Sequence, residues 1–526
     1  MTVRGAACLV GFVTLASAPF AQEAPLSAID WLSESVEQPD TIAVAPQTDP
    51  AAQGNPGSVA TRTPPADEAP VTNSAITPDV TVQTLGGPAP KTLGLLPPET
   101  TGLPANLWSG SDVATLSTLL MAEQIDTLPA LQDLIITLSI AQADPALDDP
   151  SNSAFLLARV DKLLAFGAME PAQALLEDAN TQNPQVFRRL FDVSLLTGTE
   201  NAVCRMLKSA PDVAPTAAAR IFCLARSGDW SAAALTLNTG QALGDIDGDT
   251  AALLSRFLDS ELFEGEGDLT PPDPVTPLTF RMFEAIGEPL TTRNLPRAFS
   301  HADLRSNVGW KAQLEAAERL ARSGAISPNA LVGLYSDRVP SASGGAFERA
   351  KAVIALDSAL DAADPAATAE AIETLWNEAA SLGIVTALAQ HFAPRLIEAR
   401  VDPSAHGTLF KLLLLSDLYE TAALDPDLAK TDPFLAALAT GDPADALALR
   451  PAYPVLQEAF RAGADSTLTE MASAGQLGEA ILRTIATVQQ GLDGDRIALR
   501  EGIATLRALG LEDVARRTAL QYAILP

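Results

Sequence analysis

Two of the three cysteines have the type and spacing to form a covalent bond with each other. The third, Cys8, lies in an apolar N-terminal segment that we interpret below as a removable leader. In an oxidising compartment, an even pair of cysteines indicates a disulfide rather than free thiols. Apolar periodicity predicts helices over 201–208 and 217–226, which carry Cys204 and Cys223. Antiparallel neighbours can bring such positions within bridging range, so we expect a Cys204–Cys223 disulfide, with two buried free thiols as the alternative.

Side chains that commonly catalyse reactions or bind metals are sparse. The three histidines, His301, His391 and His406, are far apart and share no ligand spacing, so we interpret them as structural or surface residues. The motifs H-E-x-x-H, C-x-x-C, G-x-x-x-x-G-K-[ST] and G-x-S-x-G are absent from the sequence. With 65 acidic residues, no carboxylate pair can be singled out as acid and base. We therefore predict no catalytic residues, no metal site and no cofactor.

Two acidic runs have the oxygen ligands that calcium prefers but lack the spacing of a calcium-binding loop. Residues 245–249, Asp-Ile-Asp-Gly-Asp, come nearest, yet no glutamate falls at the closing position. We expect Asp247 to turn the chain before a helix that starts near Thr250. The second run, 259–277, has six acidic residues, four prolines and no basic residue. We interpret it as an exposed loop between two folded arms.

The overall charge excludes two classes of partner. The formal net charge is −31 and the isoelectric point is near 4.3. Nucleic acids and anionic membrane surfaces are bound by proteins with a net basic face. We therefore expect no nucleic-acid partner. A protein partner is the expectation that remains, and the sequence does not identify it.

The first 21 residues have the layout of a secretory signal peptide. Arg4 precedes an apolar run from Gly5 to Leu15, and small residues follow up to Ala21, which we take as the last residue removed. No later stretch reaches the roughly 18 uncharged apolar residues that a transmembrane helix needs. The sequence therefore predicts an exported protein, periplasmic or secreted, without a transmembrane segment.

Residues 22–105 form a Pro/Thr/Ala-rich tail with 14 prolines in 84 positions. This composition predicts disorder, because such a stretch can bury too little apolar surface to offset its ordering entropy. Two apolar islands interrupt the tail or follow it directly, and each fits either a docking motif that folds on a partner or a segment that packs on the protein's own body. The second island abuts the folded part, which favours packing on the body, and for the first both interpretations stay open. The candidate docking residues are Leu26, Ile29, Trp31 and Leu32 in the first island and Leu95, Leu96 and Trp108 in the second.

From residue 106 onward the apolar pattern is helical and recurs in hairpin units. Glycines that end the first helix of a unit recur at spacings of 31 and 30 residues, and again near the C-terminus at 35. In four units an alanine follows five positions later, where a small side chain lets the second helix cross closely over the first. We predict an all-α fold with an N-terminal arm over 106–258 and a C-terminal arm over 276–526. The glycines are Gly167, Gly198, Gly228, Gly475 and Gly510, and the alanines are Ala172, Ala233, Ala480 and Ala515.

These units resemble the tetratricopeptide repeat (TPR). In the first unit, Leu156 and Leu163 fit the apolar positions of the first helix, and Ala172 and Leu176 fit the second helix. Val160 departs from the pattern, because the family usually has glycine there. The resemblance implies an α-solenoid of TPR-like helical hairpins, which stacks helix pairs and exposes a long concave face. It implies an architecture and not an activity.

The whole chain also resembles a group of exported bacterial proteins with a Pro-rich tail, an L-G-L-L-P-P segment and a helical body. Some of that group carry an antifreeze-glycopeptide label, although the tail here has no Ala-Ala-Thr period. These resemblances imply an exported, non-enzymatic protein-interaction scaffold, with support of an envelope or motility machine as its sharper form. The alternative is an enzyme acting on cell-wall peptidoglycan, because helical solenoids accompany some transglycosylases.

Overall fold

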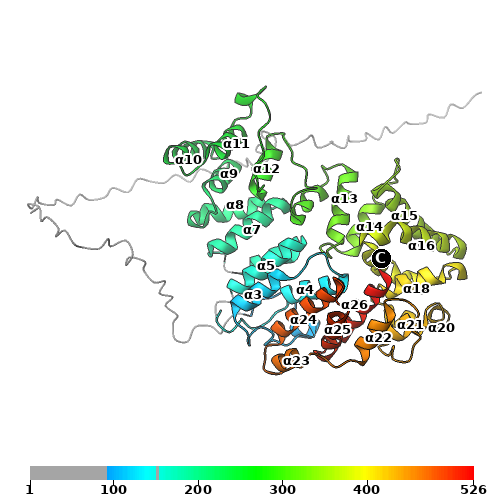
Figure 1. Ribbon diagram of the computed structural model, residues 1–526. Helices are drawn as coiled ribbons and strands as arrows, with labels where there is room; N and C mark the ends of the chain where they lie inside the picture. The colour runs from blue at the N-terminus through cyan, green and yellow to red at the C-terminus, as the bar shows by residue number, and fades with distance from the viewer. Residues whose placement is uncertain (1–91, 150–152, 180) are drawn as a thin grey trace, which may run out of the picture.

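The computed structural model describes residues 92–149, 153–179 and 181–526 (Figure 1). The expected signal peptide (1–21), most of the expected disordered tail and the first apolar island (26–32) lie outside these residues. Within the described ranges the fold is all-α, and extended pairing is limited to two isolated bridges. In the same part of the chain, no helix is long and apolar enough to span a bilayer.

The helices of the first half stack in chain order. From α5 to α11 each helix packs against the next, and α9, α10 and α11 pack against one another at the outer end of this stack (Figure 1). Two short 3-10 turns, η2 (Pro211–Val213) and η3 (Glu261–Phe263), follow α8 and α11. The α-helices are α2 (Pro98–Thr101), α3 (Val113–Ala122), α4 (Pro129–Ile140), α5 (Ala154–Phe166), α6 (Met169–Asp178), α7 (Pro184–Thr197), α8 (Glu200–Ser209), α9 (Ala217–Arg226), α10 (Trp230–Leu243) and α11 (Gly248–Leu258).

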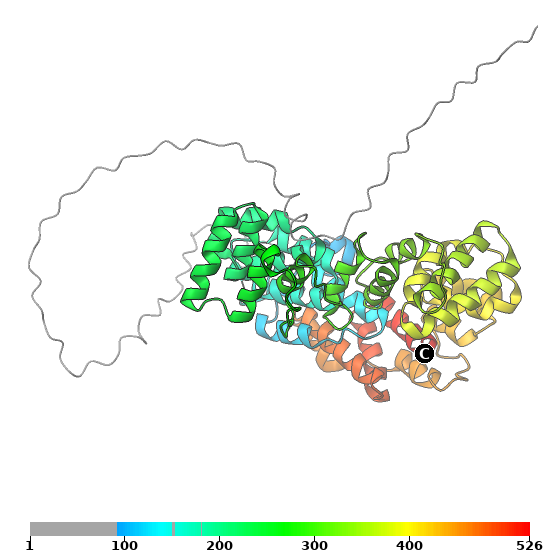
Figure 2. The ribbon, with the colours of Figure 1, turned by 90° about the horizontal axis from the view of Figure 1, so that it is seen from above.

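The second half continues with helices that form a further stack and then return to the middle of the molecule (Figures 1 and 2). The longest hairpins are α15 with α16 and α24 with α25. The elements are α12 (Pro277–Ala285), η4 (Arg297–Leu304), α13 (Trp310–Ala321), α14 (Pro328–Ser336), α15 (Ala346–Asp361), α16 (Pro365–Ala379), η5 (Ala380–Leu382), α17 (Val385–Leu396), η6 (Pro403–Ala405), α18 (His406–Leu414), α19 (Tyr419–Leu424), α20 (Pro426–Ala429), α21 (Pro433–Ala439), α22 (Tyr453–Arg461), α23 (Ser466–Ser473), α24 (Leu477–Leu492), α25 (Arg496–Ala508) and α26 (Glu512–Ile524).

The first and last helices of the described chain pack against each other. α3 lies against α24 and α4 against α26, so blue and cyan helices adjoin orange and red ones in Figure 1. The amide of Ala130 donates to Gln521 Oε1 at 2.8 Å, and Thr127 Oγ1 donates to Gln489 Oε1 at 2.6 Å. In a simple solenoid each unit contacts only its neighbours and the ends stay apart. This contact between the ends is therefore a departure from an open stack of repeats.

The acidic run 259–277 is an exposed loop, and the helices on its two sides are in contact. α12, which follows the run, packs on α7 and α11, and η4 packs on α5 and α7. Arg256 at the end of α11 forms an ion pair of 2.7 Å with Glu288, which follows α12. The expected boundary between 258 and 276 thus lies between helices that pack on one another. Contacts between the flanking helices, which composition does not encode, hold the two sides together.

Helix ends follow the glycine pattern seen in the sequence. The five glycines noted above have φ between 78° and 93°, the left-handed region that ends a helix without strain only when no Cβ is present. The alanine five positions after four of these glycines is fully buried, with 0% exposure. Close crossing of the paired helices at these positions therefore depends on a side chain no larger than a methyl group.

Candidate functional site

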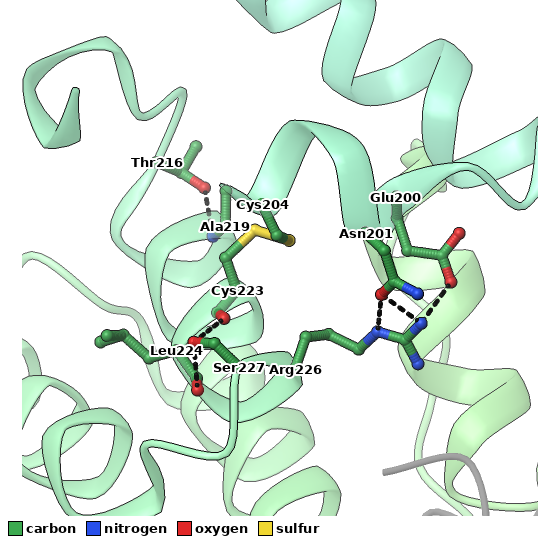
Figure 3. Close-up of a disulfide and its surroundings, with 9 residues drawn as sticks. All are labelled: Glu200, Asn201, Cys204, Thr216, Ala219, Cys223, Leu224, Arg226 and Ser227. Carbon is green, nitrogen blue, oxygen red and sulfur yellow. Dashed lines mark hydrogen bonds and ion pairs between the residues drawn. A yellow bond between two sulfur atoms is a disulfide. The ribbon is translucent and has the colours of Figure 1, made fainter. Parts of the chain in front are cut away.

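The expected bond between Cys204 and Cys223 is present and joins α8 to α9 (Figure 3). The two Cα atoms are 5.0 Å apart, and the side chains are 7% and 5% exposed. α9 spans 217–226 as predicted, and α8 extends one residue beyond the predicted 201–208 at each end. The bond is buried between two helices, which gives it a structural role.

Polar contacts fix the same hairpin on either side of the disulfide (Figure 3). Thr216 caps α9 by accepting a hydrogen bond of 3.1 Å from the amide of Ala219. Arg226, at the other end of α9, donates to Asn201 Oδ1 and forms a 3.3 Å ion pair with Glu200. Glu200 is 2% exposed and also pairs with Arg281 of α12 at 3.2 Å. A buried carboxylate between two guanidiniums keeps its charge compensated, so this cluster holds α8, α9 and α12 together.

The second apolar island packs on the body of the protein. Trp108 is 2% exposed, and Leu95 and Leu96 are partly buried. The amide of Leu95 donates to the carbonyl of Ile140 at 2.7 Å, at the end of α4. The folded part therefore includes residues 92–105, which composition had assigned to the disordered tail. The physical reason for this correction is that the amides of Leu95 and Leu96 both donate to the carbonyl of Ile140 at the end of α4, a contact that composition does not encode.

Trp108 is a core residue and not an exposed docking residue. Its ring meets Phe155 edge-on, with 4.9 Å between the ring centroids. On its other side it lies against α24, where a Cβ on Gly478 would come within 2.4 Å of the indole. The amide of Gly478 also donates to the carbonyl of Leu107 at 3.0 Å. The indole thus fills the seam between the first and last helices.

Arg159 of α5 was missed by the sequence analysis and fastens the same segment. Its guanidinium is fully buried and donates to the carbonyls of Leu93, Ser139 and Ala141 at 3.0, 2.6 and 2.8 Å. Burial lowers the pKa of Arg159 to about 10, so the side chain stays charged at neutral pH. Its one available signal in the sequence was a lone arginine within the otherwise apolar run 154–160.

The remaining candidate ligands have local partners. Among the described residues, no group of three or more His, Cys, Asp or Glu side chains lies close enough together to hold a metal ion. Asp247 accepts from the amide of Thr250 at 2.9 Å and starts α11, as expected. His301 Nε2 lies 2.6 Å from the carbonyl oxygen of Gly167, and burial lowers the pKa of His301. His391 contacts an asparagine side chain at 2.7 Å.

The outward face of α10 is exposed and uncharged. No Asp, Glu, Lys or Arg occurs in 230–244, whereas 19% of all residues in the protein are charged. Leu235 and Leu243 are 68% and 70% exposed, and Asn238 and Ala242 lie between them on the exposed side. α10 contacts α9 and α11 only on its inner side, where Ala233, Leu237 and Gly240 are buried (Figure 1). A helix at the outer end of a stack thus presents to solvent an uncharged surface that carries two exposed leucines.

A half-open cavity of about 970 Å³ lies between η4, α13 and the loop that joins α3 to α4. Five arginines and four acidic residues line it. Acidic residues from the same elements also line it, among them Asp126 and Asp303. The arginines of the cavity are Arg293, Arg297, Arg319, Arg322 and Arg349.

Both the α10 face and the cavity were absent from the sequence predictions. The α10 face had a local signal, a long gap in the charge pattern. The cavity had none, because Asp126 and Arg297, which form a 2.6 Å ion pair across it, are 171 residues apart in the chain. No family model, no curated protein and no solved structure matches the chain. The functional argument therefore depends on the residues of this protein alone.

Proposed function

We propose that the protein is an exported, non-enzymatic scaffold that binds a partner protein through the outward face of α10. The observation that carries the proposal is the uncharged, exposed surface around Leu235 and Leu243 on a chain with a net charge of −31. Apolar surface that stays exposed in a contiguous patch on a charged protein commonly marks an interaction site. The stacked helical hairpins, which resemble TPR units, supply a rigid support for that face.

The composition of the face indicates the kind of partner. Burial of most of a leucine side chain contributes roughly 1.5–3 kcal/mol, so two leucines supply a useful part of a binding free energy. Leu235, Asn238 and Ala242 follow one another at i, i+3 and i+7 spacing, which is the pattern of a helix that packs against another helix. We therefore expect the partner to contribute an apolar helix face or groove.

Export is the second part of the proposal. The buried disulfide supports it, because such bonds persist in oxidising compartments, and so does the signal-peptide pattern of residues 1–21. In its more specific version, the proposal is that the scaffold supports an envelope or motility machine. This version predicts that the partner is an integral component of the bacterial envelope.

Site-specific photo-cross-linking in the native host tests this proposal. A photoreactive phenylalanine analogue replaces Leu235, and the matched control carries it at Leu449, which is 84% exposed but lies outside α10. We expect one discrete protein adduct from position 235, lost when Leu243→Asp is added, and none from position 449. The same adduct from both positions, or no adduct from position 235, would overturn the proposed interface. Recovery of the protein only from the cytosol, with Met1 retained, would overturn export.

A further inference from the structure

The arginine-lined cavity is separate from α10 and is not explained by a scaffold function. Two of its five guanidiniums are neutralised within the fold. Arg349 forms a two-point ion pair with Glu318 at 2.6 and 2.7 Å, and Arg293 pairs with Glu315 at 3.0 Å. In each pair the carboxylate compensates the charge of its arginine. The other three arginines of the cavity are Arg297, Arg319 and Arg322.

Arg319 is held in place but carries no ion pair. One of its terminal nitrogens donates to the carbonyl of Thr292 at 2.9 Å and to Ser300 Oγ at 3.2 Å, and the other donates to the carbonyl of Leu295. Burial, and then the positive charges of Arg297 and Arg322, lower the pKa of Arg319. Arg297 and Arg322 therefore lie near enough to act on the charge of Arg319, and Asp126 and Asp303 act on it in the opposite direction.

Arg297 and Arg322 retain hydrogen-bond donors with no acceptor. Arg297 Nη2 pairs with Asp126 at 2.6 Å, but its Nη1 is buried and has no hydrogen-bond partner. Arg322 is exposed to solvent, and its side chain forms no hydrogen bond or ion pair with any residue that the structure describes. A buried donor without an acceptor costs about 1–3 kcal/mol, and clustered like charges add to that cost. This cost applies to the buried Nη1 of Arg297, which packing alone does not explain.

We propose that this cavity binds a small oxyanion with at least two anionic groups, a polycarboxylate or a diphosphate, between Arg297 and Arg322. The planar guanidinium suits the two oxygens of a carboxylate or a phosphate. A volume of about 970 Å³ is at the upper end of the range for small-molecule sites. The unpartnered Nη1 of Arg297 and the guanidinium of Arg322 offer donors to two anionic groups, while Asp126 already pairs with Nη2 of Arg297. Binding must also overcome repulsion by a chain of charge −31. The bound anion offsets the positive charges of Arg297 and Arg322 that act on Arg319.

Titration calorimetry of the full exported chain, in metal-free buffer at fixed ionic strength, tests the site with two probes. Citrate represents the polycarboxylate source, and pyrophosphate represents the diphosphate source. Arg322→Gln is the informative variant, because its side chain makes no contact that the fold needs. Arg338→Gln is the matched control, since Arg338 is exposed, lies outside the cavity and pairs only with its neighbour Asp337.

We expect saturable 1:1 binding of at least one probe to the natural protein and to Arg338→Gln. Binding to Arg322→Gln is expected to be at least ten-fold weaker, while its thermal unfolding midpoint without ligand is unchanged or higher. The probe that binds identifies the source of the anion. Failure of both probes to bind saturably, or equal binding to Arg322→Gln, would overturn the site. Either result leaves the cross-linking test of α10 unaffected, so the two proposals can fail independently.

Discussion

Arg159 shows how one side chain can complete the end of a helix. The last carbonyls of an α-helix have no partner within the helix and carry a partial negative charge. At the end of α4, Arg159 donates to the carbonyls of Ser139 and Ala141, and the amide of Leu95 donates to Ile140. The same guanidinium reaches the carbonyl of Leu93, so it ties the incoming chain to α4. The buried charge of Arg159 is tolerated because its three hydrogen bonds all go to backbone carbonyl oxygens.

Arg159→Leu should destabilise the protein by at least about 3 kcal/mol, because it leaves three buried carbonyls without their donor. Denaturant unfolding measures this loss. Hydrogen exchange should accelerate first at the amide of Leu95, which depends on the same segment. Arg188→Leu, at an exposed position of α7, is the control and should change the free energy of unfolding by less than about 0.5 kcal/mol. Unchanged exchange at Leu95 in Arg159→Leu would show that the segment is held by other contacts.

Cys204→Ser should lower the stability of the α8–α9 region by about 3 kcal/mol under oxidising conditions, because the bond closes a loop with a sequence separation of 19. The effect should fade towards distant helices and should nearly vanish in protein that is kept reduced. Region-resolved hydrogen exchange measures both. Non-reducing peptide mapping of the exported protein is the direct check, and two freely alkylated thiols would contradict the bond.

In the hairpin of α24 and α25, two glycines allow the helices to pack closely. A Cβ on Gly491 would lie 2.4 Å from the Cα of Leu499, and one on Gly502 would lie 2.6 Å from a methyl group of Val488. Both glycines are helical, so they are needed for proximity and not for an unusual backbone conformation. They bring the helix axes closer than any larger residue allows.

Gly491→Ala should destabilise the protein by about 1–3 kcal/mol, because the added methyl group forces backbone atoms of α25 away. Gly333→Ala is the matched control: it also lies inside a helix, α14, but a Cβ there meets nothing within 4 Å. Because alanine is the better helix former, the control should gain about 0.5–1 kcal/mol. Thermal and denaturant unfolding measure both changes, and equal effects of the two substitutions would contradict the argument from proximity.

Local features of the fold could be predicted from the sequence, and contacts between distant segments could not. Gly228 and Asp247 mark helix ends through chemistry that acts within a few residues, and the disulfide joins helices that are adjacent in the chain. The composition of the 84-residue tail did not predict the hydrogen bond between Leu95 and the end of α4. Backbone hydrogen bonds do not depend on residue type, so composition cannot reveal them. The arginine cavity and the Trp108 contact with Gly478 join segments that only the complete fold brings together.

Contact between the two ends should make unfolding of the whole molecule more cooperative than that of a linear stack. In a linear array, stability is approximately a sum of units and of the interfaces between neighbours. Here α3 and α4 are covered by α24 and α26, so the first helices gain a second interface from the far end of the chain. The two outer stacks, which include α10 on one side and α15 with α16 on the other, extend from this shared centre (Figure 2).

Trp108→Ala tests that coupling. Loss of the indole between Phe155 and Gly478 should cost about 3–5 kcal/mol, and hydrogen exchange should accelerate in α24 as well as in α3 and α5. Phe222→Ala is the matched control: its ring is equally buried, but it lies in α9, so exchange should accelerate in the first stack and stay slow in α24. Exchange that accelerates near α3 in Trp108→Ala but stays unchanged in α24 would show that the two ends are stable independently. Coupled acceleration would show instead that a perturbation at one end of the chain reaches the other through the seam that Trp108 fills.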